Sequence, residues 1–161
     1  MADAPKKSGS RDRVRAFLEQ HGLADGLTEF AQSTKTAAQA AEAMGCELGQ
    51  IVKSLVVVVD GRPVLALVAG DRRGDLDAIA AESGGGSARM ADADAVREAT
   101  GYAIGGVSPF DLPEGLEVLV DDSLARYDVL YPAAGTPSSM VRMARQDLER
   151  VVGGRVARIS Q

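Results

Sequence analysis

The sequence predicts a single α+β domain built on a mixed β-sheet. The chain has 161 residues, enough for one domain with a substantial core. An apolar, β-branched run at 51–59 is followed by Asp60-Gly61 and by a second apolar run at 63–69, which is typical of a β-hairpin. Elsewhere helical and extended patterns mix without the strict alternation of a parallel α/β fold, and this favours the α+β class.

The first third of the chain is expected to carry a tail and two helices. Residues 1–10 are rich in Lys, Ser, Ala and Gly, which predicts a disordered tail ahead of the folded domain at 11–161. Apolar residues at helical spacing then predict a helix over 11–21. Thr36 suits the N-cap of an alanine-rich helix that ends at Gly45.

Glycine and proline punctuate the remainder of the chain. The segment 102–113 holds two glycines and two prolines and is expected to be an irregular loop. Shorter elements complete the expected order: an extended segment or turn at 27–30; helices at 76–81, 91–100, 123–126 (capped by Asp122 or Ser123) and 145–152; and strands at 116–121, 129–133, from 139, and at 155–160.

Composition and charge limit the function. A single cysteine excludes an internal disulfide, and the sequence contains neither a long apolar stretch nor an apolar signal core. We therefore expect a cytoplasmic protein without a membrane contact. The net charge of −5 disfavours broad coating of nucleic acid, although basic clusters at 1–15 and 142–158 leave room for local phosphate contacts. Taken alone, each cluster is interpreted more simply as a solvated helix face.

Several catalytic chemistries are disfavoured by the residues present. His21 is the only histidine and is expected in a helix, so a Ser-His-Asp or Cys-His site would have to recruit it from there. Cys46 follows a helix-ending glycine and suits a packed thiol better than a nucleophile. No Cys/His cluster has zinc spacing, and the glycine-rich segment 101–106 follows a helix rather than the strand of a dinucleotide fingerprint. We expect neither a metal nor an organic cofactor.

Lys53 lies at the head of the first apolar run and is the residue most open to a chemical role. A lysine beside a buried strand loses hydration unless a partner or an anionic ligand meets it. The alternative is an edge lysine whose stem snorkels to solvent. Glycine-rich loops supply backbone N–H groups to a ligand, and a cation together with such donors suits the chemistry of acyl esters.

Six short segments form an ordered pattern across roughly residues 33–150. They are Thr36-Ala-Ala-Gln-Ala-Ala, Gly49-Gln-Ile-Val-Lys-Ser-Leu, Leu67-Val-Ala-Gly-Asp71, Gly101-Tyr-Ala-Ile-Gly-Gly-Val-Ser-Pro-Phe110, Val120-Asp121 and Ala134-Gly-Thr-Pro137. Each alone is a weak match. The ordered set resembles the YbaK / prolyl-tRNA synthetase-associated editing-domain family.

This resemblance implies a barrel-like, mostly antiparallel sheet and a trans-editing hydrolase that deacylates mischarged aminoacyl-tRNA. The tRNA is commonly tRNA(Pro) carrying cysteine, alanine or another small amino acid, and the implied partners are the tRNA acceptor end and prolyl-tRNA synthetase. The family's required lysine, which contacts the terminal adenosine and the ester, falls on Lys53. The implied substrate-binding residues are Gly105, Gly106, Val107, Ser108, Pro109, Gly135, Thr136 and Thr36.

The chain departs from the family pattern at two places. Alanine-specific members often carry a histidine in the turn after Gly135, where this chain has Thr-Pro-Ser-Ser, and some members have an asparagine at the position of Gly49. Both differences predict a differently shaped pocket and leave the amino acid open. Attack by water and attack by a substrate thiol on its own ester both stay open. So do a non-catalytic module that binds an RNA end or nucleotide, and an esterase using Cys46 or His21.

Overall fold

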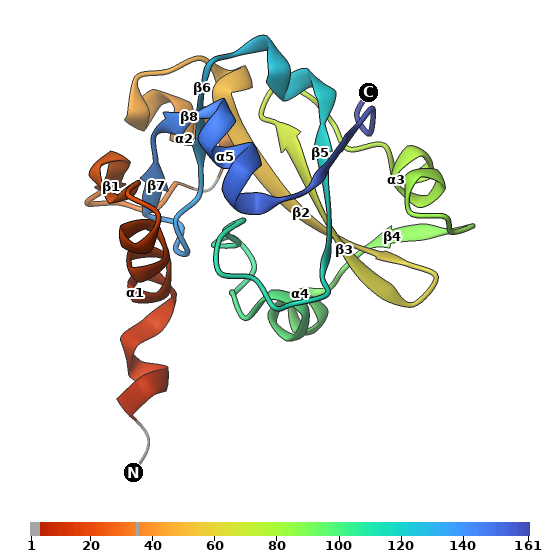
Figure 1. Ribbon diagram of the computed structural model, residues 1–161, viewed down its shortest axis with the longest axis horizontal. Helices are drawn as coiled ribbons and strands as arrows, with labels where there is room; N and C mark the ends of the chain where they lie inside the picture. Colours follow the sequence, from red (N-terminus) through yellow and green to blue (C-terminus); the bar gives the residue numbers. More distant parts are fainter. Residues whose placement is uncertain (1–3, 35) are drawn as a thin grey trace.

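The β-hairpin at the centre of the molecule consists of β2 (Ile51–Val59) and β3 (Arg62–Ala69), as the two apolar runs predict. The structure is a computed structural model that describes residues 4–34 and 36–161, with the backbone alone over 4–8. The six residues from 64 to 69 are all buried, so β3 forms the floor of the core. Figure 1 shows the hairpin crossing the molecule with the helices around it.

A mixed, curled sheet extends this hairpin on both sides, which confirms the predicted fold class. Its strands lie in the order β8-β6-β2-β3-β5-β9, and β4 also pairs with β2. The hairpin and the β2–β4 and β6–β8 pairings are antiparallel, whereas β2–β6, β3–β5 and β5–β9 are parallel. The added strands are β4 (Ala88–Met90), β5 (Glu117–Asp121), β6 (Val129–Pro132), β8 (Met143–Ala144) and β9 (Arg155–Ala157). A separate two-stranded sheet joins β1 (Leu27–Glu29) to β7 (Ser139–Val141).

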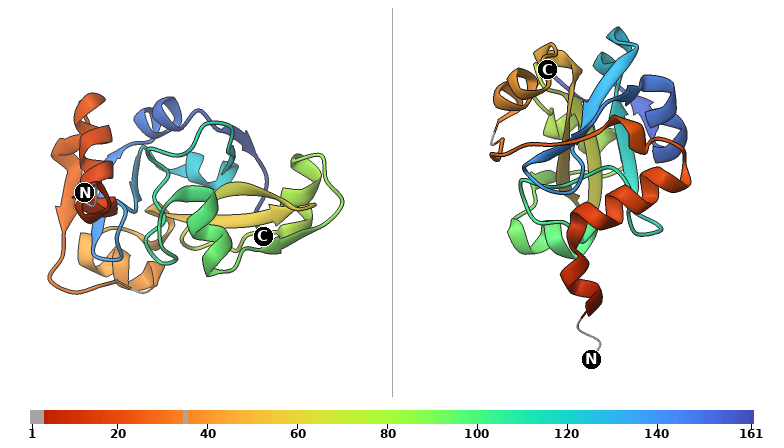
Figure 2. Two further views of the ribbon diagram at one scale, coloured as in Figure 1. Left: turned by 90° about the horizontal axis from the view of Figure 1, so that it is seen from below. Right: turned by 90° about the vertical axis from the view of Figure 1, so that its left-hand side faces the viewer.

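Five α-helices of the described chain lie around the sheet, and Figure 2 shows α1 at one end and α3 at the other. They are α1 (Ala4–Gln20), α2 (Ala37–Met44), α3 (Leu76–Glu82), α4 (Ala93–Thr100) and α5 (Arg145–Val152). Short 3₁₀ turns occupy Ala24–Gly26, Leu48–Gln50 and Asp122–Arg126. Thr36 caps α2 by accepting the N–H of Gln39, and Gly45 ends that helix in the left-handed conformation, as predicted.

Three local expectations change in the structure. The tail expected at residues 1–10 lies partly outside the described residues, and from Ala4 the backbone is helical with a break at Gly9. The 3₁₀ turn at 122–126 is capped by Asp121 rather than by Asp122 or Ser123. The short strand β4 was not predicted, because its three residues carry no alternating pattern of their own.

The loop between α4 and β5 is closed by two buried aromatic side chains. Tyr102 and Phe110 are fully buried, and the Tyr102 hydroxyl donates to the Phe110 carbonyl. Burial raises the pKa of Tyr102 to about 12, so the phenol keeps its proton. Arg13 of α1 lies 4.5 Å over the Tyr102 ring and pairs with Asp111 at 3.0 Å. The loop is thereby held to α1 and to itself.

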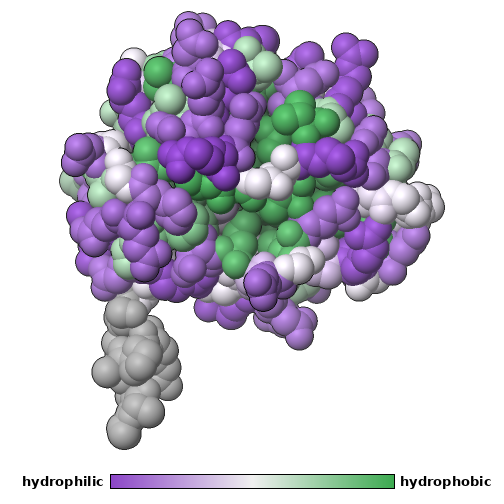
Figure 3. All heavy atoms as spheres, viewed as in Figure 1, coloured by the Kyte–Doolittle hydropathy of each residue, from purple (hydrophilic) through white to green (hydrophobic). Residues whose placement is uncertain are grey.

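The surface is charged around one apolar area. Figure 3 shows hydrophobic side chains gathered over β5, between α5 and α4, with hydrophilic residues around them. Most arginines of the two basic ends are engaged by carboxylates of the same chain: Arg11 and Arg15 by Glu29, Arg145 by Glu149, Arg150 by Asp147, and Arg155 by Glu82 and Glu117. In the described part of the chain, no helix combines the length and the apolar character needed to cross a bilayer.

Candidate functional site

One edge of β2 is open for four residues in the middle of the strand. On the edge opposite β3, β6 pairs only with Ile51 and Val52, and β4 pairs only from Val57 onward, so none of the described strands pairs with 53–56 there. The Val56 carbonyl accepts the N–H of Ala91 at 3.0 Å on this edge. Because backbone polar groups alternate in direction along a strand, Ser54 turns its N–H and C=O into the gap.

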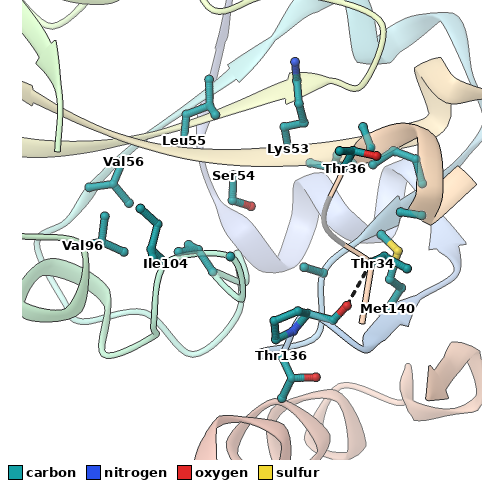
Figure 4. Close-up of a pocket in the computed structure, with 18 of the residues that line it drawn as sticks. Thr34, Thr36, Lys53, Ser54, Leu55, Val56, Val96, Ile104, Thr136 and Met140 are labelled. Carbon is teal, nitrogen blue, oxygen red and sulfur yellow. Dashed lines mark hydrogen bonds between the residues drawn. The ribbon is translucent and has the colours of Figure 1, made fainter. Parts of the chain in front are cut away.

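A cavity of about 250 Å³ lies at this gap. Its walls come from α2, β2, β4, α4, the loop after α4 and the turn before β7. Figure 4 shows the arrangement: Ser54 and Val56 point from one face of β2 toward Val96 and Ile104, whereas Lys53 and Leu55 point from the other face. The cavity is lined by Thr34, Thr36, Ala37, Ala40, Ile51, Val52, Lys53, Ser54, Leu55, Val56, Met90, Ala91, Val96, Ile104, Gly105, Val107, Ala133, Thr136, Pro137, Ser139 and Met140.

Five of the residues implied as site residues line this cavity: Lys53, Thr36, Gly105, Val107 and Thr136. Segments that are 100 residues apart in the sequence therefore meet at one place. Their roles toward a substrate stay predictions, since the geometry places the side chains and no more.

The other four implied residues lie behind the wall of the cavity. Ser108 is fully buried, and its hydroxyl accepts the N–H of Phe110 at 3.4 Å. Pro109 is buried beside it. A Cβ built on Gly106 would lie 3.0 Å from the Gly135 carbonyl oxygen, and one on Gly135 would lie 2.8 Å from the Ser10 carbonyl oxygen. These residues pack the loop, the turn and α1 together rather than contacting the cavity.

Lys53 is half-buried and is not free of partners. Its ammonium group donates to the carbonyl of Arg72. Desolvation by burial lowers the pKa of Lys53, and the nearby Asp71 carboxylate works in the opposite direction. One N–H of the ammonium is used by this carbonyl, and a lysine has three. Lys53 can therefore donate to a further acceptor while it keeps its hydrogen bond to the Arg72 carbonyl.

Asp71 is paired with Arg126 and not with Lys53. Two guanidinium nitrogens of Arg126 donate to the two carboxylate oxygens at 3.0 and 2.7 Å, and this pairing lowers the pKa of Asp71. A Cβ at Gly49 would lie 2.4 Å from the Tyr127 hydroxyl and 3.0 Å from an Asp71 carboxylate oxygen. The absence of a side chain at Gly49 thus makes room for this pair.

A second cavity of about 510 Å³ adjoins the first on the Lys53 side of β2. Lys53, Leu55 and Met90 line both cavities, so the two lie next to each other. Arg73 adds a second cation to the second cavity, together with Asp75 and Asp77. Lys53 therefore lies between a mostly apolar cavity and a charged one.

The residues of the esterase alternative lie elsewhere. Cys46 is half-buried outside both cavities, and burial raises the pKa of its thiol, which disfavours the thiolate. His21 is exposed at the end of α1, where its ring stacks on Phe17 at 4.4 Å. Within residues 4–34 and 36–161, no three His, Cys, Asp or Glu side chains come together as a metal site.

Sequence reasoning missed Ser54 and Arg126. Ser54 follows Lys53 in the same apolar run, and strand alternation could have assigned it to the opposite face. Arg126 carries no local signal, because its partner is 55 residues away.

Known proteins of one family resemble this chain in sequence and in structure. The model of the aminoacyl-tRNA editing domain family matches residues 31–151. The chain is 31% identical over 156 residues to the multifunctional Ser/Thr-tRNA deacylase ProXp-y of Escherichia coli K12, covering 94% of this chain and 93% of that protein. It is 28% identical over 160 residues to EbsC of Enterococcus faecalis, a candidate Cys-tRNA(Pro)/Cys-tRNA(Cys) deacylase, covering 98% of both chains.

A solved structure shares the fold. The crystal structure of a candidate trans-editing enzyme for prolyl-tRNA synthetase superposes with a TM-score of 0.86 and 39% identity, over 94% of this chain and 97% of that one. The matched family segment contains all the described residues that line the smaller cavity, including Lys53. The chain belongs to the aminoacyl-tRNA editing domain family.

Proposed function

We propose that this protein is a trans-editing hydrolase that removes a small, wrongly attached amino acid from tRNA. The observation that carries the proposal is the cavity at the open edge of β2, where Lys53 and unpaired backbone groups meet. At about 250 Å³ the cavity is smaller than most ligand pockets, which run from about 300 Å³ upward, and it suits one small side chain. The deacylase names of two relatives support the same activity.

The two cavities suggest how such a substrate would lie. The aminoacyl group would occupy the smaller, mostly apolar cavity, with its ester at the gap beside the free N–H of Ser54. The terminal nucleotide would pass Lys53 toward the larger cavity, where Arg73 offers a second cation for phosphate. Lys53 then contacts the junction between nucleotide and amino acid.

Catalysis in this arrangement depends on positioning. No His, Cys, Asp or Glu is among the described residues that line the smaller cavity, so none of them serves there as a general base. An aminoacyl ester is already activated, and fixing the attacking group at the carbonyl supplies much of the remaining rate. Lys53 and the Ser54 N–H stabilise negative charge as it develops on the ester oxygens. The attacking group is water or, in a cysteinyl ester, the substrate thiol.

The proposed substrate is tRNA(Pro) carrying a small amino acid, with prolyl-tRNA synthetase as a partner in the cytoplasm. Two observations support this choice: a relative is named for Cys-tRNA(Pro), and the structural neighbour is described as acting for prolyl-tRNA synthetase. The editing segment also matches within proline–tRNA ligases, with 40% identity over 83 residues in one of them.

The test is a deacylation assay on tRNA(Pro) charged with Ala, Cys, Ser, Thr or Pro, using the full chain. We expect loss of ester from at least one small amino acid, and a reduction of kcat/KM by about 10²-fold or more in Lys53→Ala. Arg158→Ala is the matched control, because Arg158 is an exposed cation outside both cavities. Binding of the tRNA with every ester left intact would show a non-catalytic RNA-binding module instead.

A further inference from the structure

Nearly all hydroxyl groups on the cavity wall have partners within the protein. Thr34 donates to the Pro137 carbonyl at 2.9 Å, and Thr36 accepts the N–H of Gln39 at 3.1 Å. Thr136 and Ser139 bond to each other at 2.7 Å. These hydroxyls hold the wall together, and they have reduced capacity to recognise a ligand.

Ser54 is the exception among the described residues of the wall. Its Oγ is shielded from solvent and has no hydrogen-bond partner. A buried hydroxyl without a partner is unfavourable, so proteins rarely keep one without a reason. Its surroundings in the cavity are apolar, since Val56, Val96 and Ile104 lie on the same side of β2. The strand pairing with β3 fixes the backbone of Ser54, and rotation about Cα–Cβ is the remaining freedom of the hydroxyl.

In the described part of the chain, one more buried hydroxyl has no partner, and it has a different position. Ser83 ends α3 and lines neither of the two cavities, and its carbonyl accepts from Arg62. Among the described residues, Ser54 alone combines an unpaired hydroxyl with a cavity sized for a small side chain. This combination indicates a group that acquires its partner when a ligand enters.

We propose that the Ser54 hydroxyl hydrogen-bonds the side-chain hydroxyl or thiol of the wrongly attached amino acid. The inference rests on the proposed function and narrows its substrate class to seryl, threonyl and cysteinyl esters, with alanyl esters disfavoured. A side chain that offers a hydroxyl or thiol satisfies Ser54, whereas a methyl group leaves it unpaired in an apolar cavity. Sites that hydrogen-bond a substrate hydroxyl discriminate far more strongly against its absence than apolar pockets discriminate by size.

The test measures kcat/KM for tRNA(Pro) charged with Ser, Thr, Cys or Ala on the wild type and on three variants. We expect the wild type to prefer the seryl over the alanyl ester by about 10²-fold or more. In Ser54→Ala this ratio should fall below about tenfold through slower hydrolysis of the seryl ester, with the alanyl ester hydrolysed at least as fast as before. Ser54→Thr, which keeps the hydroxyl, and Ser83→Ala, which removes the other unpaired hydroxyl, should both retain the preference.

The outcomes separate this inference from the proposed function. A wild type that hydrolyses the alanyl ester as fast as the seryl ester overturns the role of Ser54, while the deacylase activity stands; this result needs no variant to fold. A preference that is unchanged in Ser54→Ala overturns it as well. Failure of the wild type to hydrolyse any of the four esters overturns the proposed function itself.

Discussion

The ammonium group of Lys53 lies near the carboxylate of Asp71, which already accepts two hydrogen bonds from another side chain. Arg126 donates to both oxygens of Asp71, and Lys53 donates instead to the carbonyl of the next residue, Arg72. A free Asp71 would compete with a substrate for the ammonium group. In the proposed function Arg126 therefore leaves Lys53 available for the substrate, although Arg126 itself lines neither of the two cavities.

We expect Arg126→Gln to slow deacylation because it releases Asp71 toward Lys53. A partly exposed ion pair is worth up to about 1 kcal/mol, which corresponds to about a fivefold loss in kcat/KM. Adding Asp71→Asn removes the competing charge and should restore most of the activity, which steady-state kinetics on the three variants would measure. A double variant as slow as Arg126→Gln would argue for a merely structural role of this pair.

At the residue scale, the sequence singled out the lysine of the candidate site but did not indicate the residues around it. Lys53 is conspicuous because it interrupts an apolar run, and that signal is local. The pairing of Arg126 with Asp71 depends on which loops the fold brings together, and no spacing in the chain encodes it. The implied residues Ser108 and Pro109 are correctly placed in the loop, yet they turn inward and pack behind the wall.

Three elements hold the cavity wall through contacts between backbones. The loop after α4 meets the turn before β7 at Gly106, where a Cβ would lie 3.0 Å from the Gly135 carbonyl oxygen and 3.1 Å from the Thr136 Cα. Gly135 in turn meets the Ser10 carbonyl of α1 and has a φ of +98°, which favours glycine. The absence of side chains at Gly106 and Gly135 thus sets how closely the loop, the turn and α1 approach one another.

We expect Gly106→Ala to push the loop away from the turn and to widen the cavity. Backbone atoms cannot yield as a flexible side chain would, so the substitution should cost about 1–3 kcal/mol of stability and raise KM for every ester. Thermal unfolding and deacylation kinetics would measure the two effects. Gly86→Ala is the matched control, since a Cβ there meets nothing within 4 Å and φ is not positive. Equal behaviour of the two variants would refute a role of this contact.

The sequence predicts closely those elements whose residue pattern is local. It does not predict the features that depend on pairing between strands distant in the chain. The hairpin β2–β3 and the capped helix α2 follow from patterns within 20 residues. The edge of β2 is open because the pairing with β6 ends at Val52 of β2, and the pairing with β4 begins only at Val57. Both partner strands come from distant parts of the chain. The site lies in that gap, so sequence patterns locate its lysine but not its opening.

At the scale of the whole molecule, one buried carboxylate fastens the C-terminal segment to the sheet. Asp121 is 1% exposed at the end of β5. It accepts the N–H of Ile159 at 2.8 Å, the hydroxyl of Ser160 at 2.7 Å, and both the N–H and the hydroxyl of Ser123. The chain end then continues to Gln161, which bonds the backbone of Arg73 and lines the larger cavity. Asp121 thus links global stability to the shape of that cavity.

The ionised carboxylate of Asp121 makes the stability of the protein sensitive to acid. Burial by itself would raise the pKa of this carboxyl, but the hydrogen bonds it accepts outweigh burial and lower the pKa below the ordinary value of 3.8. A carboxyl with a lowered pKa stabilises the fold fully above its unfolded-state pKa and loses that contribution as pH falls through the folded value. The contribution of Asp121 should therefore be constant from neutral pH down to about 4 and decline below it.

We expect Asp121→Asn to destabilise the protein by about 2–4 kcal/mol at pH 7, because the amide nitrogen faces groups that themselves donate hydrogen bonds. Since the titrating group is gone, the stability of the variant should fall less steeply with acid than that of the wild type, so the two denaturant midpoints converge below about pH 4. Urea unfolding at pH 7, 5 and 3 measures this, with Asp122→Asn as the exposed neighbour that should follow the wild type. Parallel pH curves for Asp121→Asn and the wild type would mean that another carboxyl controls acid stability and that Asp121 acts through shape alone.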